Sequence, residues 1–474
     1  MKPWRSIIPL SLLLALTTIT LQGTGQAAPV ATRNLYIPVL STAHDTGWTS
    51  PFGVEMSMVS ERTGVVEAER AGFRWVRLNA LVWSTVEPIR TSPATYQWNA
   101  VASVENDLRT ARKYGLEPIL IIRGTPGWAA VHPDWACSAI KREALSAFAS
   151  FVKAAVQRYS QPPYQVRYYE LYNEPDAAPD LVQKESVFGC WGDLSDNQWY
   201  GGDDYAAMLK EAYPAIKAAN PEAVVILGGL LYDDPGRPAS LRFLDGILAN
   251  GGADNFDWMN FHYYFQGDRW DPWGPGIIGK ATYIRQTLAK YGVTNKPLIC
   301  TETALRTFGH EDLEPLKADF AIEANVRAMR ANIPVVIWYP LLYPGFFGSG
   351  LLDPSGLAPK PAYTAYAIMS RNLASARYLR PMTAEELGGA ANVEGHILTH
   401  RNGTEPLWVL WTTPVTATTA QANVRFPAAQ FPKGMRITDR VGSTISVTDA
   451  TDGAKDGQIT VTVGPSPRFF EAVR

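Results

Sequence analysis

Short apolar runs and amphipathic stretches alternate along most of the chain. Eight apolar runs have the length and composition of β-strands, and each precedes a stretch with apolar residues at helical spacing. The predicted strands are 53–58, 73–79, 118–124, 166–173, 223–230, 256–263, 296–301 and 334–338. The predicted helices are 64–71, 100–114, 142–159, 204–219, 241–250, 281–291, 316–331 and 361–376. Eight consecutive βα units predict an α/β fold of the (β/α)₈ TIM barrel type.

An open, doubly wound sheet is the structural alternative for such an alternation. That fold usually carries a glycine-rich dinucleotide turn directly after its first strand. No such turn follows the run 53–58. The pattern therefore favours the closed barrel.

The pattern changes after residue 376. Short alternating runs are separated there by turn residues such as Asn402-Gly403 and Asp452-Gly453. They predict a C-terminal all-β sandwich over 377–474, after a barrel over 28–376. The run 34–40 is a further candidate strand for this second domain. Because no low-complexity linker separates the two regions, we expect the domains to pack together.

The first 27 residues have the organisation of an export signal. Lys2 and Arg5 precede the apolar run 7–21, and small residues follow as far as Ala27. A retained membrane anchor is the alternative, but the run is shorter than the ~20 residues of a spanning helix. We expect cleavage after Ala27, secretion, and no membrane insertion of the mature protein.

Composition excludes some classes of partner. The chain of 474 residues is 46% hydrophobic and 19% charged, which is typical of globular proteins, and its net charge is −2. It therefore offers no basic field for nucleic acid. The composition predicts no particular oligomeric state.

The three cysteines are too few for a disulfide-built scaffold. Cys137 and Cys190 follow the third and fourth predicted strands, so both lie at the same end of neighbouring βα units. In an oxidising compartment they can pair, and two unpaired thiols are the alternative. Cys300 lies within a predicted strand, where we expect a buried free thiol.

Two apolar runs each deliver a glutamate at their C-terminal end. Tyr-Glu-Leu-Tyr-Asn-Glu-Pro-Asp ends the fourth strand with Glu174, and Pro-Leu-Ile-Cys-Thr-Glu-Thr ends the seventh with Glu302. The C-terminal ends of barrel strands converge on one face, where barrel enzymes carry their sites. Two carboxyl groups on either side of one bond are what acetal cleavage in sugars requires. Glu170 lies about 13 Å deeper, at ~3.3 Å per residue, and we expect it to be an interior polar residue.

These motifs resemble those of glycoside hydrolase clan A. Asn-Glu-Pro after strand four and Thr-Glu-Thr after strand seven match the clan. The longer form Tyr-Glu-Leu-Tyr-Asn-Glu-Pro-Asp, with Trp-Val-Arg ending at Arg77 before it, is most similar to family 39 and its relatives. The resemblance implies a retaining glycosidase with Glu174 as acid/base, Glu302 as nucleophile, and no metal or organic cofactor. Its substrate would be an oligosaccharide or a polysaccharide.

The resemblance also implies roles for supporting residues. Arg77 would place a cation near the nucleophile, and Asn173 would bind the 2-hydroxyl of the sugar. In the sequence His262-Tyr263-Tyr264, Tyr264 would donate to Glu302 and His262 would lie near the acid/base. The alternative for this sequence is an exposed pair of loop aromatics.

Tryptophans in the predicted loops are candidates for sugar stacking. We expect Trp338, at the end of strand eight, to form the floor of the sugar subsite and Trp128 to stack a further sugar. Other candidates are Trp83, Trp135, Trp191, Trp199, Trp270 and Trp273. Aromatics on two sides of the mouth favour endo-action on a β-linked polysaccharide. An exo-acting enzyme, similar to β-xylosidases or uronidases, is the alternative.

Two other function classes fit the sequence less well. A metal-dependent barrel hydrolase needs clustered histidines, and none of the six forms His-x-His at a strand end. A non-catalytic carbohydrate-binding or adhesion protein explains export and the β domain. It does not explain why both glutamates are present.

Overall fold

The structure is a computed structural model that describes the chain in six stretches. They are residues 50–231, 240–265, 276–342, 346–400, 405–414 and 417–473. The predicted export signal, the candidate strand 34–40, and Trp270 and Trp273 lie outside these residues. Within the six stretches, no helix has both the length and the apolar character needed to cross a bilayer.

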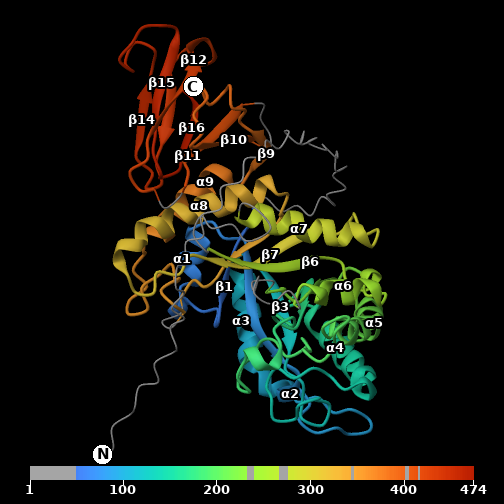
Figure 1. Ribbon diagram of the computed structural model, residues 1–474. Coiled ribbons are helices and arrows are strands. Elements are labelled where there is room, and N and C mark those ends of the chain that lie inside the picture. The colour runs from blue at the N-terminus through green and yellow to red at the C-terminus, as the bar shows by residue number, and fades with distance from the viewer. Residues whose placement is uncertain are drawn as a thin grey trace, which may run out of the picture. The chain divides into compact units, whose positions relative to one another are not determined.

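Eight parallel strands form the central sheet, as predicted (Figure 1). Its order is β5-β4-β3-β2-β1-β8-β7-β6, and parallel bridges Ile226–Trp258 and Leu230–Phe261 join β5 to the β6 side. The sheet therefore closes on itself as a TIM barrel. The strands are β1 (Phe52–Met56), β2 (Trp75–Val82), β3 (Glu117–Arg123), β4 (Tyr168–Leu171), β5 (Val224–Leu227), β6 (Met259–Tyr264), β7 (Leu298–Ala304) and β8 (Val336–Trp338).

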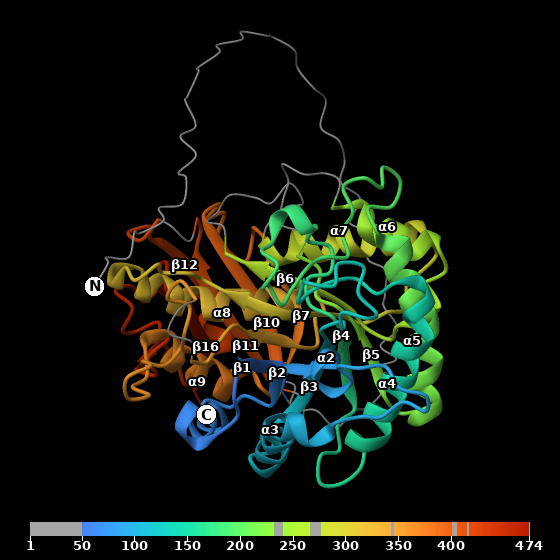
Figure 2. The same ribbon diagram turned by 90° about the horizontal axis from the view of Figure 1, so that it is seen from below.

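Helices follow the strands and lie outside the barrel (Figure 2). In the helix after β3, Phe148, Phe151 and Val152 are buried while Ser150 and Lys153 are exposed. One apolar stripe per helix is what packing on one side of a sheet requires. The helices are α1 (Val65–Arg70), α2 (Trp83–Val86), α3 (Ala102–Lys113), α4 (Leu145–Tyr159), α5 (Gly202–Ala219), α6 (Arg242–Ala249), α7 (Gly276–Lys290), α8 (Glu314–Arg330) and α9 (Pro361–Leu373).

The inside of the barrel changes from apolar to charged along the strands. Its apolar end is filled by one buried cluster, which consists of Trp75, Ile119, Tyr168, Ile226, Ile299, Val335 and Ile337. Two residues further along β2 and β4, on the same side of each strand, lie Arg77 and Glu170. The charged layer therefore lies toward the C-terminal ends of the strands.

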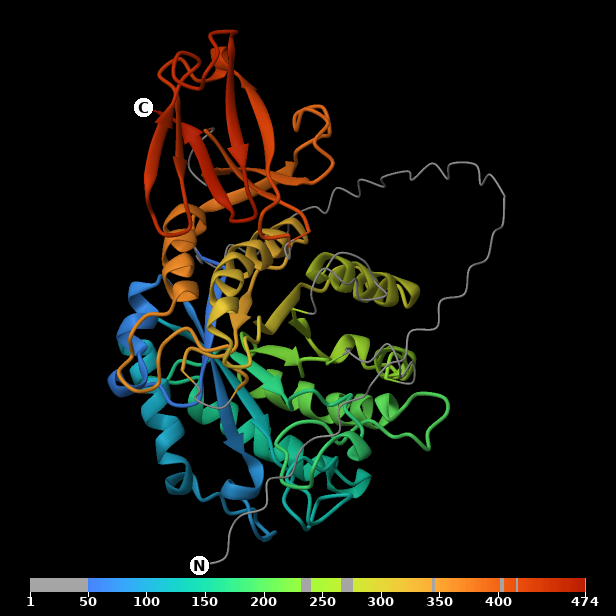
Figure 3. The ribbon, with the colours of Figure 1, turned by 60° about the vertical axis from the view of Figure 1, so that its left-hand side comes forward.

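The C-terminal region is an antiparallel β domain next to α8 and α9 (Figure 3). A six-stranded sheet has the order β14-β13-β16-β11-β10-β9, and β12 pairs with β15. The strands are β9 (Ala376–Pro381), β10 (Val393–His400), β11 (Pro406–Thr412), β12 (Ala422–Pro427), β13 (Met435–Thr438), β14 (Thr444–Val447), β15 (Gln458–Val463) and β16 (Arg468–Ala472). Strand β9 was not predicted, because it is an edge strand with alternate residues exposed and lacks a continuous apolar run.

The predicted disulfide is confirmed. Cys137, in the loop after β3, is bonded to Cys190, in the loop after β4. Cys300 is a buried free thiol in β7. The bond ties two loops together at the end of the barrel where the charged layer lies.

Candidate active site

Glu302 is placed by a β-bulge in β7. Phe261 of β6 pairs with Cys300, whereas the next residue, His262, pairs with Glu302, so Thr301 is an extra residue in β7. Such a bulge re-aims side chains, and here two successive residues serve the same site. Thr301 contacts Asn260 and His262, while Glu302 contacts the residues described next.

Arg77, at the centre of the site, is almost completely buried. Its guanidinium donates to Glu55 at 2.6 Å, to Glu170 at 2.7 and 2.9 Å, and to Glu302 at 2.6 Å. It also donates to the Asn173 side-chain oxygen at 2.7 Å. Burial alone would lower the pKa of Arg77, but Glu170, Glu55 and Glu302 raise it well above its ordinary value. The group is therefore a permanent cation.

Both oxygens of the Glu302 carboxylate accept hydrogen bonds. Oε1 accepts from Arg77, and Oε2 accepts from the Tyr264 hydroxyl. Donors on both oxygens stabilise the ionised carboxylate and fix its plane. The side chain is only 7% exposed, and it lines the cavity described below.

Glu174 lies on a strained backbone at the end of β4. Its φ is 45°, in the left-handed region that residues other than glycine seldom adopt, at a cost of about 1–3 kcal/mol. The Glu174 N–H donates to the Gly229 carbonyl at 3.1 Å. Gly229 in turn has to be glycine, because a Cβ there would lie 2.1 Å from His262 Nε2. Strain of this kind occurs mainly at functional sites.

His262 orients the Glu174 carboxyl group. Its Nδ1 lies 2.8 Å from Glu174 Oε1, and its Nε2 lies 3.2 Å from the Thr301 hydroxyl. That hydroxyl oxygen already accepts a bond from Asn260, so its proton is available to His262 Nε2. Burial lowers the pKa of His262 to about 4. In the neutral tautomer with its proton on Nδ1, the ring donates to Glu174 and accepts from Thr301.

The two carboxyl groups approach each other closely. One ligand atom from each of Glu174, His262 and Glu302 lies within 4.8 Å of the other two. Among the described residues, this is the one group with the side chains and spacing of a metal site. A cation there would lie next to Arg77 and would compete with the hydrogen bonds from Tyr264 and His262, so the geometry fits a carboxylate pair better than a metal centre.

Glu55 is a site residue that sequence reasoning missed. Burial raises the pKa of Glu55 to about 8; Arg77 acts against this shift, and Glu302 adds to it. Glu55 also lines the cavity above Glu302. Its sequence signal is a glutamate within the apolar run Phe-Gly-Val-Glu-Met of β1. Glu170 is fully buried, as expected of an interior polar residue.

A cavity of about 420 Å³ opens at this end of the barrel. Glu55, Arg77, Asn173, Glu174 and Glu302 contribute its polar surface together with Arg306. Its aromatic lining comes from the loops after β4 and β8 and from β6, as Phe188, Phe346, Phe347, Tyr339 and Tyr264. The volume is within the range of ligand-binding clefts.

The structure brings six of the eight predicted site residues together around this cavity. They are Arg77, Asn173, Glu174, His262, Tyr264 and Glu302. The prediction that Trp338 forms the floor of the sugar subsite is wrong. Its side chain is fully buried, packs against Phe320 and Tyr366 of α8 and α9, and donates to the Ser349 carbonyl. The next residue, Tyr339, has the opposite orientation and lines the cavity.

Other predicted sugar-stacking tryptophans also lie away from the cavity. Trp128 packs edge-on against Trp83 and donates to the Glu87 carbonyl, and it is absent from the cavity lining. Trp83 and Trp191 are buried; Trp191 packs between Tyr172 and Tyr205. These rings stabilise the loops around the site and do not form its surface.

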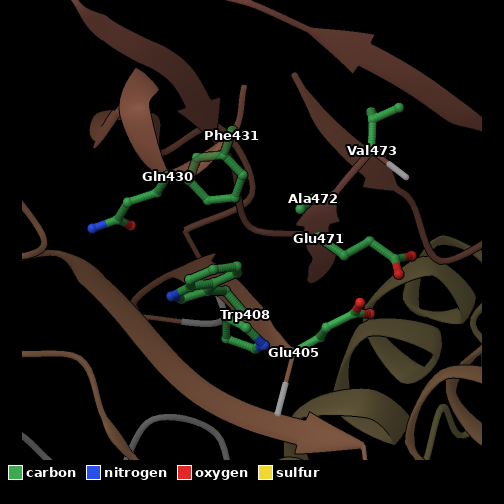
Figure 4. Close-up of a pocket in the computed structure, with 8 residues that line it drawn as sticks. Glu405, Trp408, Gln430, Phe431, Glu471, Ala472 and Val473 are labelled. Carbon is green, nitrogen blue, oxygen red and sulfur yellow. The ribbon is translucent and has the colours of Figure 1, made fainter. Parts of the chain in front are cut away.

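A second cavity, of about 340 Å³, lies in the β domain (Figure 4). Trp408 and Phe431 form its apolar part, and Glu405 and Glu471 lie on one side. Both rings belong to the buried core of the domain. None of the barrel residues described above lines it.

Comparison with known proteins identifies the family. Residues 38–340, well over half of the chain, match the model of the cellulase family, glycosyl hydrolase family 5. The chain belongs to this family. The clan A assignment predicted from the two glutamate motifs is thereby confirmed, and this family 5 member is a glycoside hydrolase that acts on carbohydrate. No curated protein sequence matches the chain.

Solved structures similar to this family 5 chain share its fold at low sequence identity. A family 39 glycoside hydrolase from Bacteroides cellulosilyticus WH2 has a TM-score of 0.67 at 18% identity, over 90% of this chain and 81% of the other. A family 30 endoxylanase from Clostridium papyrosolvens C71 has a TM-score of 0.59 at 15% identity, over 90% of this chain and 98% of the other. A family 39 β-xylosidase from Caulobacter crescentus has a TM-score of 0.53 at 16% identity, over 90% of this chain and 96% of the other.

Proposed function

We propose that the protein is a secreted, retaining glycoside hydrolase that cleaves β-linked polysaccharide by double displacement. The observation that carries this proposal is that one carboxylate oxygen of Glu174 lies within 4.8 Å of one carboxylate oxygen of Glu302. Retaining enzymes hold their carboxyl groups about 5–5.5 Å apart, whereas inverting enzymes leave about 6.5–9.5 Å for a water molecule. The short separation supports direct attack by a carboxylate.

In the first step, ionised Glu302 attacks the anomeric carbon while Glu174 gives its proton to the departing oxygen. The bond to the leaving sugar breaks, and a glycosyl ester with Glu302 forms. In the second step, Glu174 removes a proton from water, which attacks the same carbon and releases Glu302. One group thus acts first as acid and then as base.

The hydrogen bonds around the pair support these roles. Arg77 and Tyr264 each donate to one oxygen of Glu302, which suits a group that attacks as an anion. His262 Nδ1 lies 2.8 Å from one oxygen of Glu174, and a proton on Nδ1 would leave the acidic proton of Glu174 to the other oxygen. Asn173 is held beside the pair by Arg77, at the position proposed to meet the 2-hydroxyl.

The lining of the cavity supports endo-action. Val187 and Phe188 from the β4 loop line the cavity together with Tyr339, Phe346 and Phe347 from the β8 region. Apolar side chains from two separate loops offer contacts to more than one sugar of a polysaccharide. Among the similar structures are both an endoxylanase and a β-xylosidase, so exo-action is the competing mode.

Export is proposed from the first 27 residues and from the disulfide between Cys137 and Cys190. Disulfides form and persist in oxidising compartments. Expression with residues 1–27 intact should give a mature N-terminus after Ala27 in the secreted fraction.

Azide rescue tests the two roles separately. Glu302→Ala should lose nearly all activity. Added azide should partly restore substrate cleavage, and the product should be a glycosyl azide of inverted configuration. Glu174→Ala, assayed with an activated aryl glycoside, should give with azide a product of retained configuration. Glu222→Ala is the control, because its side chain is 81% exposed on the surface. The same azide product from both variants would overturn the assignment.

Product sizing tests the mode of action. Early oligosaccharides of mixed length from a polysaccharide would support endo-action. Monosaccharide alone from the first minutes would show exo-action instead.

A further inference from the structure

Arg306 is a second cation in the catalytic cavity. It lies two residues after the end of β7 and lines the same cavity as Glu302 and Tyr264. Its guanidinium carbon lies 4.3 Å from the ring centre of Tyr264, 4.9 Å from Phe346 and 5.3 Å from Phe347. Three aromatic rings therefore hold this side chain in place.

Within the described part of the chain, Arg306 forms no ion pair. Its Nε is buried and has no hydrogen-bond partner there. Arg77, by contrast, is surrounded by three carboxylates and an amide oxygen. Aromatic faces attract a cation but carry no net charge, so none of the described residues supplies a carboxylate partner for Arg306, which is partly buried.

Arg306 lies close to the position where the reacting sugar would bind. The hydroxyl of Tyr264 donates to Glu302, and the ring of the same Tyr264 packs against the Arg306 guanidinium. One tyrosine ring thus separates the cation from the nucleophile. A substituent on the sugar at Glu302, or on its neighbour, would be within reach of this cation.

We propose that Arg306 recognises an anionic substituent of the substrate. The matching chemistry is a planar or tetrahedral oxyanion, the carboxylate of a uronic acid or a sulfate ester, because guanidinium donors pair best with such groups. This inference rests on the proposed glycosidase function and names its substrate class. A neutral glycan would offer no oxyanion to the Arg306 guanidinium.

A comparison of matched substrates tests this inference. Aryl glucosides, glucuronides and 6-sulfated glucosides, together with neutral, uronic-acid and sulfated polysaccharides, form the panel. The wild-type enzyme should prefer an acidic member over its neutral counterpart in kcat/KM. Arg306→Gln should lower this acidic-to-neutral ratio about 10- to 100-fold, the worth of one charge-assisted hydrogen bond, and Arg306→Lys should lower it less. Whether the uronate or the sulfate shows the preference identifies the oxyanion.

Arg371→Gln is the matched control, because it removes the same charge from an exposed position on α9. It should leave the acidic-to-neutral ratio unchanged. If Arg306 only clamps the aromatic rings, Arg306→Gln will lower kcat/KM for acidic and neutral substrates equally, and that result would overturn the inference.

Binding measurements separate this inference from the catalytic proposal. Calorimetry on Glu302→Gln protein, with Arg306 intact, should show tighter binding of acidic than of neutral oligosaccharides. Equal binding of both would overturn the role of Arg306 even where Arg306→Gln protein fails to fold. Preferential acidic binding without hydrolysis by the wild-type enzyme would support Arg306 and contradict the proposed catalytic function.

Discussion

At the residue scale, the site depends on the guanidinium of Arg77. Three buried carboxyl groups accept from it, those of Glu55, Glu170 and Glu302, so its removal leaves all three without their charged donor. Breaking a buried ion pair from one side typically costs about 3–5 kcal/mol. Arg77→Met should lower the free energy of unfolding by at least that much in urea titrations, whereas exposed Arg371→Met should change it by less than about 0.5 kcal/mol. A similar, small effect of both variants would show that the carboxylates do not depend on Arg77.

The raised pKa of Glu55 predicts that the stability of the protein depends on pH. Burial raises the pKa of Glu55 in the folded protein to about 8, from 4.5. The folded protein therefore holds a proton on Glu55 that the unfolded chain has lost, and this contribution to stability is complete below about pH 4.5 and disappears as the pH rises through 8. The substitution Glu55→Gln places an uncharged side chain at this position at every pH. Relative to the wild-type protein, this variant should gain stability between pH 5 and pH 9 in denaturant titrations, and a constant difference would contradict the raised pKa.

At the element scale, the end of β8 provides a matched pair of neighbouring aromatics, Trp338 as its last residue and Tyr339 directly after it. Trp338 packs against α8 and α9, so Trp338→Ala should cost about 3–5 kcal/mol of stability. Tyr339 lines the cavity, so Tyr339→Ala should lower kcat/KM about tenfold, the worth of one aromatic contact. Melting temperatures and kinetics of both variants check this, and the reverse pattern would contradict the register of β8.

The same strands show which parts of the site the sequence could predict. Each strand appears as an apolar run, and parallel strands bring their C-terminal ends to one face, so Glu174 and Glu302 could be placed without coordinates. The alternation of inward-facing and outward-facing side chains breaks at the β7 bulge, where Thr301 is an extra residue. This bulge arises from the pairing with β6, so the local sequence does not reveal it. Trp338 was misplaced for a related reason: an apolar run does not show which of its residues face the helices. Glu55 was missed because its partner, Arg77, lies on another strand.

At the scale of the whole molecule, part of the β domain packs into the apolar core around the barrel, while the rest of the domain forms a core of its own. Leu398, Leu407 and Trp411 of the β domain belong to the same buried cluster as the barrel helices. Arg327 of α8 pairs with Glu394 of β10 at 2.6 Å. We therefore predict a single calorimetric unfolding transition, and Glu394→Ala should lower its temperature without dividing it. Two separate transitions in the wild-type protein would show independent domains.

The central claim is that Glu302 attacks the sugar directly, and product stereochemistry tests it most directly. Proton NMR during the first minutes of hydrolysis records the anomer before mutarotation. A β-linked substrate that the enzyme cleaves should give the β-anomer first, because two successive displacements restore the starting configuration. The α-anomer as the first product would mean that water attacks in a single step, and it would contradict the role of Glu302 as nucleophile.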